Sequence, residues 1–345
     1  MKTVYFRVDG NDIIASGHVM RCLAIAKQIR NLEAQVRFIV ADDKSVALIE
    51  QMGFSYDILD SFWNNLDQET EKMIAYIKRN SVKVLFIDSY YVSNGYLEKL
   101  SQYTKVIYLD DLNRFVYPVH TIINYGMWFK SDYCVQAYRK KGLNTEFMLG
   151  AKYVPLREEF ETDHVSINKN VDRVLITTGG TDQLHVAKKL LEAVMDNRNL
   201  CDLEYHVISG CFNKDKKVLY KMSCDNSQIH IHENVRNMAW WMQQSDVAVS
   251  ASGTTLYEFA ACGTPTVCLE VAENQKGADK WEKNKYMYYA GNAATDIDTC
   301  IDKCVDCLIK YKNSYELRYE YSERMKQLVD GKGARRIAQY LLGLV

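Results

Sequence analysis

The clearest pattern in the chain is a strand, a loop and a helix near its start. Residues 4–8 read VYFRV, an aromatic and β-branched run that predicts a strand. Apolar residues then return at helical spacing from position 19, so we expect a helix to begin near His18. His18 therefore lies where a strand connects to the next helix, which is where open α/β sheets bind ligands. Gly17 beside it permits a close backbone approach, although a histidine packed at a helix start remains the competing interpretation.

The same alternation of strand and helix continues through the first half of the chain. It indicates a doubly wound parallel sheet, because the elements alternate rather than forming separate runs. The predicted strands are 36–40, 56–59, 82–88, 105–109 and 121–124, with helices at 46–52 and 67–79. Polar residues that follow these strands meet at one edge of such a sheet: Asp9, Asp88, Tyr90, Asp110 and Asn124. Taken singly, Asp9 and Asp111 are interpreted as caps or turn formers.

A polar stretch at 161–170 interrupts this pattern, and a second sheet begins near residue 171. The fold class is therefore expected to be α/β, with two Rossmann-like, doubly wound domains. We place the N-terminal domain, with the candidate histidine, at 1–165 and the C-terminal domain, with a helical tail, at 166–345. Strands of the second domain are predicted at 173–177, 204–209, 229–231, 246–250 and 266–269, and tail helices at 315–328 and 334–342.

Two loops in the second domain put small and hydroxyl residues between a strand and a helix. Bare backbone N–H groups and the helix dipole at such places suit a diphosphate. Glu258 falls in the first turns of the second helix, where it could accept hydrogen bonds from ribose hydroxyls or simply complement the dipole. The candidate nucleotide-binding residues are Gly179, Gly180, Thr181, Ser252, Gly253, Thr254 and Glu258.

Composition narrows the class of protein. The 345 residues are 48% hydrophobic and 25% charged, with a net charge of −1, which gives no electrostatic case for binding nucleic acid or an anionic membrane. No apolar run is long enough to span a membrane, and a strand begins too early for a signal peptide. The ten cysteines are scattered, which is typical of reduced thiols. We expect a cytoplasmic protein, and no partner protein is implied.

Several other kinds of site are disfavoured. The chain has no G-x-x-x-x-G-K-[ST] motif, and its first loop has no G-x-G-x-x-G, which argues against NTPases and dinucleotide-dependent oxidoreductases. Cys300, Cys304 and Cys307 have the spacing of an iron–sulfur site, but this spacing also fits the buried stripe of a helix. His230 and His232 alternate with isoleucines in a predicted strand and are interpreted as structural. Neither a metal nor a cofactor is expected.

The motifs form an ordered series: R-x-D and S-G-H-x-x-R-C, then D-x-Y, then G-x-x-Y-x-x-L-R-x-E-F, then G-G-T-D, S-A-S-G-T-T-x-x-E and a late N-Q. This series, from about residue 3 to residue 282, resembles that of the UDP-sugar hydrolases of the pseudaminic acid pathway, the PseG- and SpsG-type proteins. Those proteins are similar in turn to the MurG-like transferases of the GT-B fold.

The resemblance implies a two-domain GT-B enzyme that hydrolyses a UDP-2,4-diacetamido-2,4,6-trideoxyhexose to UDP and free sugar for nonulosonic acid biosynthesis. It implies that His18 activates the water, without metal, for inverting attack at the anomeric carbon. The two loops of the second domain would hold UDP. The residues assigned to the sugar site are Gly17, Arg21, Tyr90, Asn274 and Gln275.

Two other functions stay open at this point. One is a MurG-like glycosyltransferase that uses a similar UDP-sugar donor, and the other is a non-catalytic subunit that binds a nucleotide sugar. An exposed apolar or basic patch on the first domain would favour a lipid-linked acceptor and hence the transferase. The placement of His18 beside Gly17 speaks against a pure binding subunit, because binding UDP alone does not require it.

Overall fold

The chain forms two compact units, each built on one parallel sheet. The computed structural model describes residues 2–14, 16–127, 131–162, 166–210 and 212–345, without the side chains of 131–134 and 274. Unit 1 comprises Met1–Glu158 together with Gly331–Val345, and unit 2 comprises Glu159–Asp330. The predicted α/β architecture of two doubly wound domains is confirmed.

Unit 1 contains a seven-stranded sheet in the order β3-β2-β1-β4-β5-β6-β7, with every neighbouring pair parallel. The order reverses between β1 and β4, because β1 lies beside both β2 and β4. The strands are β1 (Thr3–Val8), β2 (Gln35–Val40), β3 (Ser55–Ile58), β4 (Val84–Asp88), β5 (Lys105–Leu109), β6 (Thr121–Asn124) and β7 (Glu146–Leu149).

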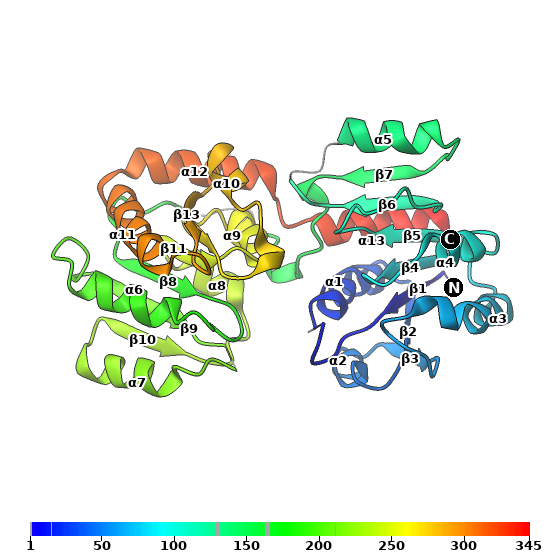
Figure 1. Cartoon of the computed structure of the whole chain (residues 1–345), viewed down its shortest axis with the longest axis horizontal. Coiled ribbons are helices and arrows are strands. Elements are labelled where there is room, and N and C mark those ends of the chain that lie inside the picture. Colours follow the sequence, from blue (N-terminus) through cyan, green and yellow to red (C-terminus); the bar gives the residue numbers. More distant parts are fainter. Residues whose placement is uncertain (1, 15, 128–130, 163–165, 211) are drawn as a thin grey trace. The chain divides into compact units, whose positions relative to one another are not determined.

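Helices cover both faces of this sheet (Figure 1). The apolar sides of α3 and α4 pack on one face, while on the other face the rings of Phe6, Phe38 and Phe86 lie together, 4.9–5.4 Å between centroids. Strand alternation explains this division, since successive side chains point to opposite faces. The helices of unit 1 are α1 (Gly17–Asn31), α2 (Val46–Gln51), α3 (Thr70–Asn80), α4 (Asn94–Ser101), α5 (Ser131–Lys140) and α13 (Gly333–Leu344).

The last helix corrects the predicted domain division. We placed the whole tail in the second domain, but α13 packs against α1 in unit 1, and both chain ends lie on that unit (Figure 1). Its buried face consists of Ala334, Ile337, Ala338 and Leu341. Gly333 touches the backbone at Val154, where a Cβ would come within 2.1 Å of the carbonyl oxygen. Helical periodicity predicted the helix, but it carries no information about which sheet the apolar face covers.

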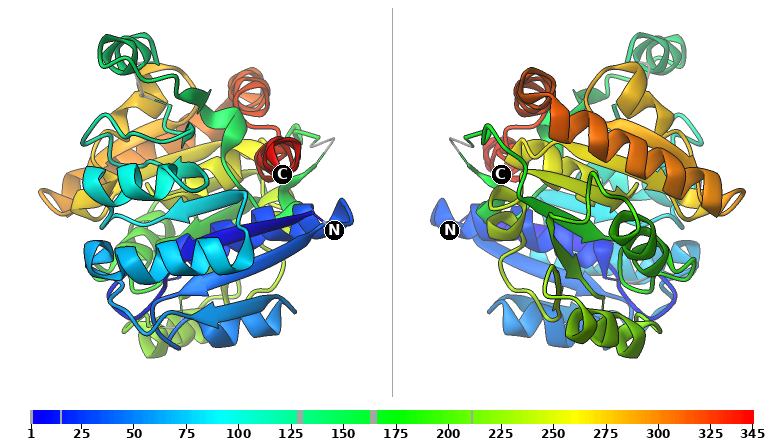
Figure 2. Two further views of the ribbon diagram at one scale, coloured as in Figure 1. Left: turned by 90° about the vertical axis from the view of Figure 1, so that its right-hand side faces the viewer. Right: turned by 90° about the vertical axis from the view of Figure 1, so that its left-hand side faces the viewer.

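Unit 2 contains a six-stranded parallel sheet in the order β10-β9-β8-β11-β12-β13. The order reverses between β8 and β11, as it does between β1 and β4 in unit 1. The strands are β8 (Arg173–Thr177), β9 (Glu204–Ile208), β10 (Ile229–His232), β11 (Val247–Ala251), β12 (Thr266–Glu270) and β13 (Tyr288–Asn292). The green-to-orange ribbon in the right panel of Figure 2 shows these strands with their helices.

The helices of unit 2 are α6 (Val186–Met195), α7 (Lys216–Asp225), α8 (Met238–Gln243), α9 (Thr255–Cys262), α10 (Asp279–Lys283), α11 (Ile297–Asn313) and α12 (Tyr315–Leu328). The apolar sides of α6 and α11 pack on the sheet in one continuous core. Strands β7 and β13 were not predicted. Both are short, edge-positioned and only half-buried, so neither carries the continuous apolar run of a central strand.

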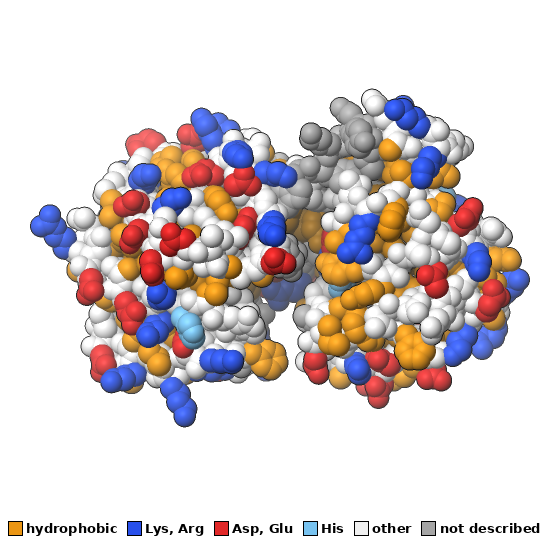
Figure 3. Space-filling model, viewed as in Figure 1, with side chains coloured by type: hydrophobic (Ala, Val, Ile, Leu, Met, Phe, Trp, Pro, Cys, Tyr) orange, Lys and Arg blue, Asp and Glu red, His pale blue; other side chains and the backbone are white. Residues whose placement is uncertain are grey.

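Charged side chains of both signs intermingle on the surface that Figure 3 shows, in keeping with the net charge of −1. Within the described part of the chain, no helix has both the length and the apolar composition needed to cross a bilayer.

The three cysteines with iron–sulfur spacing lie on α11 and are buried. Cys300, Cys304 and Cys307 belong to the core between α11 and the sheet. Their spacing is therefore that of a helix stripe facing a core, as the competing interpretation held.

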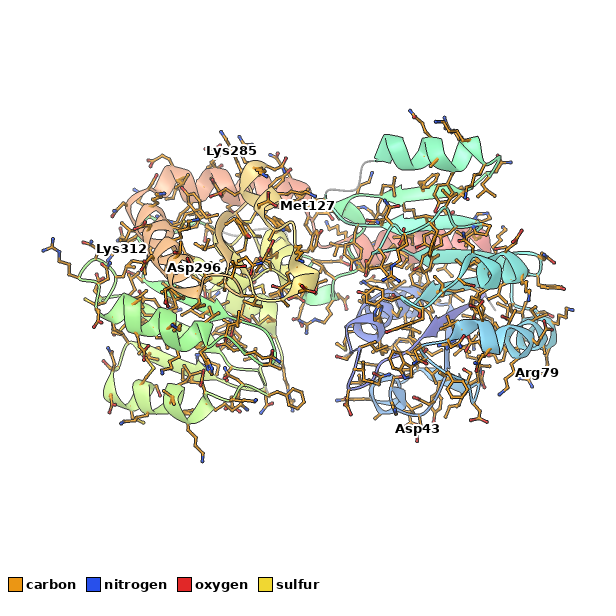
Figure 4. The ribbon with its side chains drawn as sticks, in the orientation of Figure 1. Asp43, Arg79, Met127, Lys285, Asp296 and Lys312 are labelled. Atoms are coloured by element: carbon orange, nitrogen blue, oxygen red, sulfur yellow. The ribbon has the colours of Figure 1, made fainter. Side chains whose placement is uncertain are left out.

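Asp296, labelled in Figure 4, caps α11 by accepting a hydrogen bond from the backbone N–H of Thr299 at 3.1 Å.

Candidate functional site

In each unit the candidate residues gather at the carboxyl edge of the sheet, around the point where the strand order reverses. In unit 1 the loops that follow β1, β4, β5 and β6 are neighbours, because these strands are adjacent in the sheet. Such a switch point leaves a depression between loops that run in opposite directions, and ligands of open α/β sheets bind there.

The N-terminal cluster is organised by Asp88, the last residue of β4. Its Oδ1 lies 2.6 Å from Nδ1 of His18, at the start of α1. Arg21, one turn further along α1, donates to both carboxylate oxygens, from Nε at 2.6 Å and from Nη2 at 2.5 Å. The Asp88 carboxylate at 2.6 Å favours the tautomer of His18 with the proton on Nδ1, and Nη2 of Arg21 lies 3.0 Å from the same nitrogen. Nε2 of His18 has no hydrogen-bond partner among the described residues.

The electrostatics keep this carboxylate charged. Burial of Asp88 opposes its ionisation, but the charges of Arg21 and His18 and their hydrogen bonds outweigh burial and hold the Asp88 pKa well below its usual range. Arg21 and Asp88 have side chains 12% and 1% exposed, so the ion pair is screened little by solvent. Asp88 is therefore a fixed anion that orients the imidazole of His18.

Arg21 extends the cluster to the next two strands. Its Nη1 lies 2.6 Å from Oδ2 of Asp111 and 2.6 Å from the hydroxyl of Tyr125. Our interpretation of Asp111 as a turn former was therefore wrong: Asp110 caps that turn, accepting from the backbone N–H groups of Leu112 and Asn113. Arg21 was assigned to the sugar site, and in the structure it braces Asp88.

Tyr90 lies over the imidazole of His18, with the ring centroids 4.4 Å apart and the planes nearly perpendicular. Its hydroxyl is 3.4 Å from Oδ2 of Asp111. Burial, followed by the nearby charge of Asp111, raises the pKa of Tyr90 to about 12, so its hydroxyl stays protonated at neutral pH. Gly17 is exposed, and a Cβ there would meet nothing within 4 Å, so the fold does not require glycine at this position.

Three residues of this cluster were absent from the predicted site: Asp88, Asp111 and Tyr125. The sequence did carry a signal for Asp88, because it ends a predicted buried strand and falls at the same sheet edge as Tyr90. The pairing of β1 with β4, which brings Asp88 beside the first loop, came from the structure. The sequence carried no comparable signal for Tyr125, whose place depends on how far the β6 loop reaches toward α1.

In unit 2 the loops after β8, β11 and β12 are neighbours at the carboxyl edge. The start of α9 is the more open of the two predicted phosphate sites. No side chain caps α9, and the backbone N–H groups of Thr254 and Thr255 have no acceptor among the described residues. A Cβ on Gly253 would meet nothing within 4 Å, so a ligand can reach the backbone there. An uncapped helix start beside a glycine is suited to an anion.

The other helix start differs from its prediction. The carboxylate of Asp182 accepts hydrogen bonds from the backbone N–H groups of Val186 and Ala187, both at 3.0 Å, so the start of α6 is not bare. The N–H groups that remain open are in the loop before it, at Gly179, Gly180 and Thr181, which are exposed and have no protein acceptor in the described part. The prediction missed this because it read Asp182 only as part of a G-G-T-D motif.

The glycine loop is held in place by a third glycine. A Cβ on Gly210, which follows β9, would lie 2.4 Å from the carbonyl oxygen of Gly180, so only glycine fits. Gly179 has φ +87, a backbone conformation that favours glycine. The carbonyl of Gly180 also accepts from the N–H of Phe212 at 3.1 Å. The loop after β9 therefore packs against the loop after β8 and fixes its backbone.

The remaining predicted residues lie near these loops. Glu258 is half-buried in α9, and Ser252 precedes Gly253. Gln275 bonds back to its own loop, its Oε1 accepting from the N–H of Val271 at 2.9 Å. The side chain of Asn274 lies outside the described residues. Glu270 was not predicted; it ends β12 and holds the following loop by accepting from the N–H of Gly277 at 2.9 Å.

No family model matches the sequence. Curated relatives do. An uncharacterised protein of Methanocaldococcus jannaschii is 26% identical over 78% of the chain, which spans only 55% of that relative. The spore coat polysaccharide biosynthesis protein SpsG of Bacillus subtilis is 24% identical over 97% of the chain and 96% of its own length. The UDP-2,4-diacetamido-2,4,6-trideoxy-beta-L-altropyranose hydrolase of Campylobacter jejuni is 23% identical, covering 82% of this chain and 96% of its own.

Solved structures give the fold. MurG of Acinetobacter baumannii superimposes with a TM-score of 0.70 at 13% identity, covering 99% of this chain and 100% of its own. The pneumococcal O-GlcNAc transferase GtfA, solved with UDP and GlcNAc, gives a TM-score of 0.64 at 11% identity, covering 99% of both chains. At such identities the likeness shows the fold alone, which is the GT-B fold.

Proposed function

We propose that this chain, a sequence relative of SpsG and of the PseG-type UDP-sugar hydrolases with a GT-B fold, is a UDP-sugar-processing enzyme of sugar biosynthesis. The reaction we propose is hydrolysis of a UDP-2,4-diacetamido-2,4,6-trideoxyhexose to UDP and the free sugar. The observation that carries the proposal is the buried Asp88–His18 pair at the switch point of the first sheet.

This pair supports general-base chemistry. Asp88 holds Nδ1 of His18 at 2.6 Å, which leaves Nε2 as the nitrogen that can take a proton. A histidine is suited to this role near neutral pH, and a neighbouring carboxylate stabilises the imidazolium that forms. A protein that only bound UDP would have no use for an oriented base. The pair therefore supports an enzyme over a binding subunit.

The proposed step is a displacement at the anomeric carbon. The oxygen of water forms a bond to that carbon while the bond from carbon to the β-phosphate oxygen breaks, and UDP leaves with the electron pair. The proton released by water passes to Nε2 of His18. Attack from the face opposite UDP inverts the anomeric configuration. Tyr90, whose ring is nearly perpendicular to the imidazole of His18, is proposed to contact the sugar together with Gly17.

The departing UDP carries the developing negative charge. The open N–H groups at Gly179, Gly180, Thr254 and Thr255 are proposed to stabilise its diphosphate, aided by the dipole at the start of α9. Backbone donors of this kind are preorganised and act without a metal. Glu258 on α9 is proposed to accept from the ribose.

The decisive experiment follows UDP release from the UDP-diacetamido-trideoxyhexose in chelator, without an acceptor, by the parent and by His18→Ala. We expect the variant to lose about 10²- to 10⁴-fold in kcat. His120→Ala is the control, since this other unit 1 imidazole is half-exposed and, among the described residues, its ring hydrogen-bonds to neighbouring Thr121. In heavy-oxygen water the label should enter the sugar. Label on UDP would mean attack at phosphorus and would contradict the mechanism.

One observation favours a second candidate, a MurG-like transferase. Large exposed side chains lie in the loops after β3, β4 and β5, at the sheet edge that carries His18: Phe62 is 61% exposed, Tyr91 40% and Phe115 50%. Such side chains could receive an apolar acceptor. In the same assay, UDP release that occurs only when an acceptor extract is added would replace hydrolysis by transfer. Binding of the donor without turnover under either condition would leave only the nucleotide-sugar-binding subunit.

A further inference from the structure

Three imidazoles and a carboxylate lie on one face of β9 and β10, away from the loops described above. The two strands pair in parallel, with His206 opposite His230 and Ile208 opposite His232. Strand alternation places Glu204 and His206 on the same face of β9. The opposite face, with Tyr205 and Val207, is part of the core. The four polar side chains therefore share the other face at the sheet's edge.

The rings are close and nearly parallel. The His206 ring lies 4.8 Å from that of His230 and 5.2 Å from that of His232. Nδ1 of His206 and Nε2 of His232 are 3.0 Å apart, which is a hydrogen bond. Nε2 of His206 is buried and has no hydrogen-bond partner in the described part of the chain; the nearest carboxylate oxygen, from Glu204, lies at 3.6 Å. An unpartnered buried nitrogen of this kind requires an explanation.

We propose that Glu204, His206 and His230 bind a divalent transition-metal ion of the zinc class. One donor atom from each residue lies within 4.8 Å of the other two. Ligands about 2.1 Å from a tetrahedral ion stand roughly 3.4 Å apart, so small side-chain rotations close the site. Imidazole nitrogen and carboxylate oxygen are donors that suit zinc. The fourth position would be open to water.

His232 completes the argument as a positioning residue. Metal-bound histidines usually make a hydrogen bond through their other ring nitrogen, which fixes the tautomer and orientation of the ring. The bond between His206 Nδ1 and His232 Nε2 is of this type, and it directs Nε2 of His206 toward Glu204. Trp241 packs on His232, with ring centroids 4.0 Å apart. Nε of Arg173 also lies 3.2 Å from Oε2 of Glu204, but this ion pair is exposed to solvent and contributes little to stability.

The site is distinct from the proposed nucleotide loops. Glu204 is the first residue of β9, so the ligands begin at the amino end of the strand, whereas the loops lie at the carboxyl ends. A metal ion bound by Glu204 and His206 of β9 and His230 of β10 would cross-link the edge strand to its neighbour. We therefore expect it to stabilise unit 2 without changing the affinity for UDP.

The test is a titration of untagged, chelator-stripped full-length protein with Co²⁺ and Zn²⁺. We expect one ion per chain, the intense visible bands of four-coordinate cobalt, and quenching of tryptophan fluorescence through Trp241. Glu204→Gln and His206→Ala should remove tight binding, and His232→Ala should weaken it about 10- to 100-fold. His120→Ala should bind as the parent does. Circular dichroism of each variant establishes that it is folded.

Equal binding by the parent and Glu204→Gln, or no binding at stoichiometric concentrations, would overturn the proposal. A thiolate-to-cobalt charge-transfer band would do the same, because it would place the ion on a cysteine such as the exposed Cys201 or Cys224.

Discussion

Asp88 lies at the centre of the N-terminal cluster because three donors converge on its two oxygens. His18 and Arg21 reach it from one face of α1, three residues apart, and the thiol of Cys22 lies 3.6 Å from Oδ2. Residues three or four positions apart share a helix face, so a single helix supplies all these donors. The chemistry of His18 therefore depends on a residue seventy positions away in the chain.

Asp88→Asn should reveal this dependence in the pH profile of stability. The folded-state pKa of Asp88 is lowered, so the carboxylate stabilises the fold fully above the ordinary aspartate pKa of about 4. We expect the variant to lose about 3 kcal/mol of unfolding free energy at pH 7, because Arg21 loses its buried partner. The difference in unfolding free energy between parent and variant should narrow as the pH falls below about 4 and on through the lowered pKa of Asp88. Urea unfolding at several pH values measures it.

Asp110→Asn is the matched control, because burial raises the pKa of Asp110 instead. Its carboxylate is disfavoured in the fold, and an asparagine Oδ1 can keep the hydrogen bonds from Leu112 and Asn113. This variant should be as stable as the parent at pH 7 or more so. A gap for Asp88→Asn that stays constant down to pH 2 would contradict the role assigned to its charge.

The helices α1, α6 and α9 follow the candidate loops after β1, β8 and β11. They share one architecture, but their N–H groups have different fates. The start of α1 presents His18, the start of α6 is closed by Asp182, and the start of α9 is open. Only α6 and α9 are candidates for phosphate. At α6 the candidate donors are in the loop before the helix. Similar motifs thus produce different sites.

Gly180→Ala tests the use of that loop. A Cβ at this position meets no atom within 4 Å and φ is not positive, so the unliganded fold accommodates alanine. A diphosphate seated on the backbone would meet the added methyl group, so we expect UDP to bind about tenfold more weakly with unchanged thermal stability. Gly343→Ala, also in open space but in α13 of unit 1, is the control. Equal UDP affinity in calorimetry for parent and Gly180→Ala would place the diphosphate elsewhere.

On the scale of the whole molecule, the chain leaves unit 1 at residue 158 and returns to it at 331. The returning helix α13 buries Ile337 and Leu341 and packs against α1, the helix that carries His18. The last residues of the chain therefore support the first functional helix.

Ile337→Ala should show which unit this helix stabilises. The side chain is fully buried, and its truncation leaves a cavity that costs about 3 kcal/mol. We expect faster hydrogen exchange, followed by mass spectrometry, in β1 and α1 and no change in β11 and β12. Leu308→Ala, buried on α11, should give the reverse pattern. Faster exchange in both units for either variant would mean that the units unfold together.

The sequence by itself determined the central strands, the main helices and the kind of sheet. Local periodicity is enough for this, because residues 4–8, 82–88 and 246–250 read as buried strands and the segments after them as helices. It also placed His18 and Tyr90 at strand ends of the first sheet and the two glycine loops at strand ends of the second, where each parallel sheet gathers its own residues at its carboxyl edge. The resemblance carried by the order of motifs implied the GT-B fold, which the solved structures confirm.

Only the tertiary structure decided how side chains distant in sequence meet. The pairing of β1 with β4 brought Asp88 to His18, the pairing of β9 with β10 brought His206 to His230, and the close approach of Gly210 supported Gly180. The packing of α13 on unit 1 was likewise decided by the tertiary structure. Periodicity records which face of an element is apolar, whereas contacts between elements depend on strand order and loop reach, which no local pattern encodes.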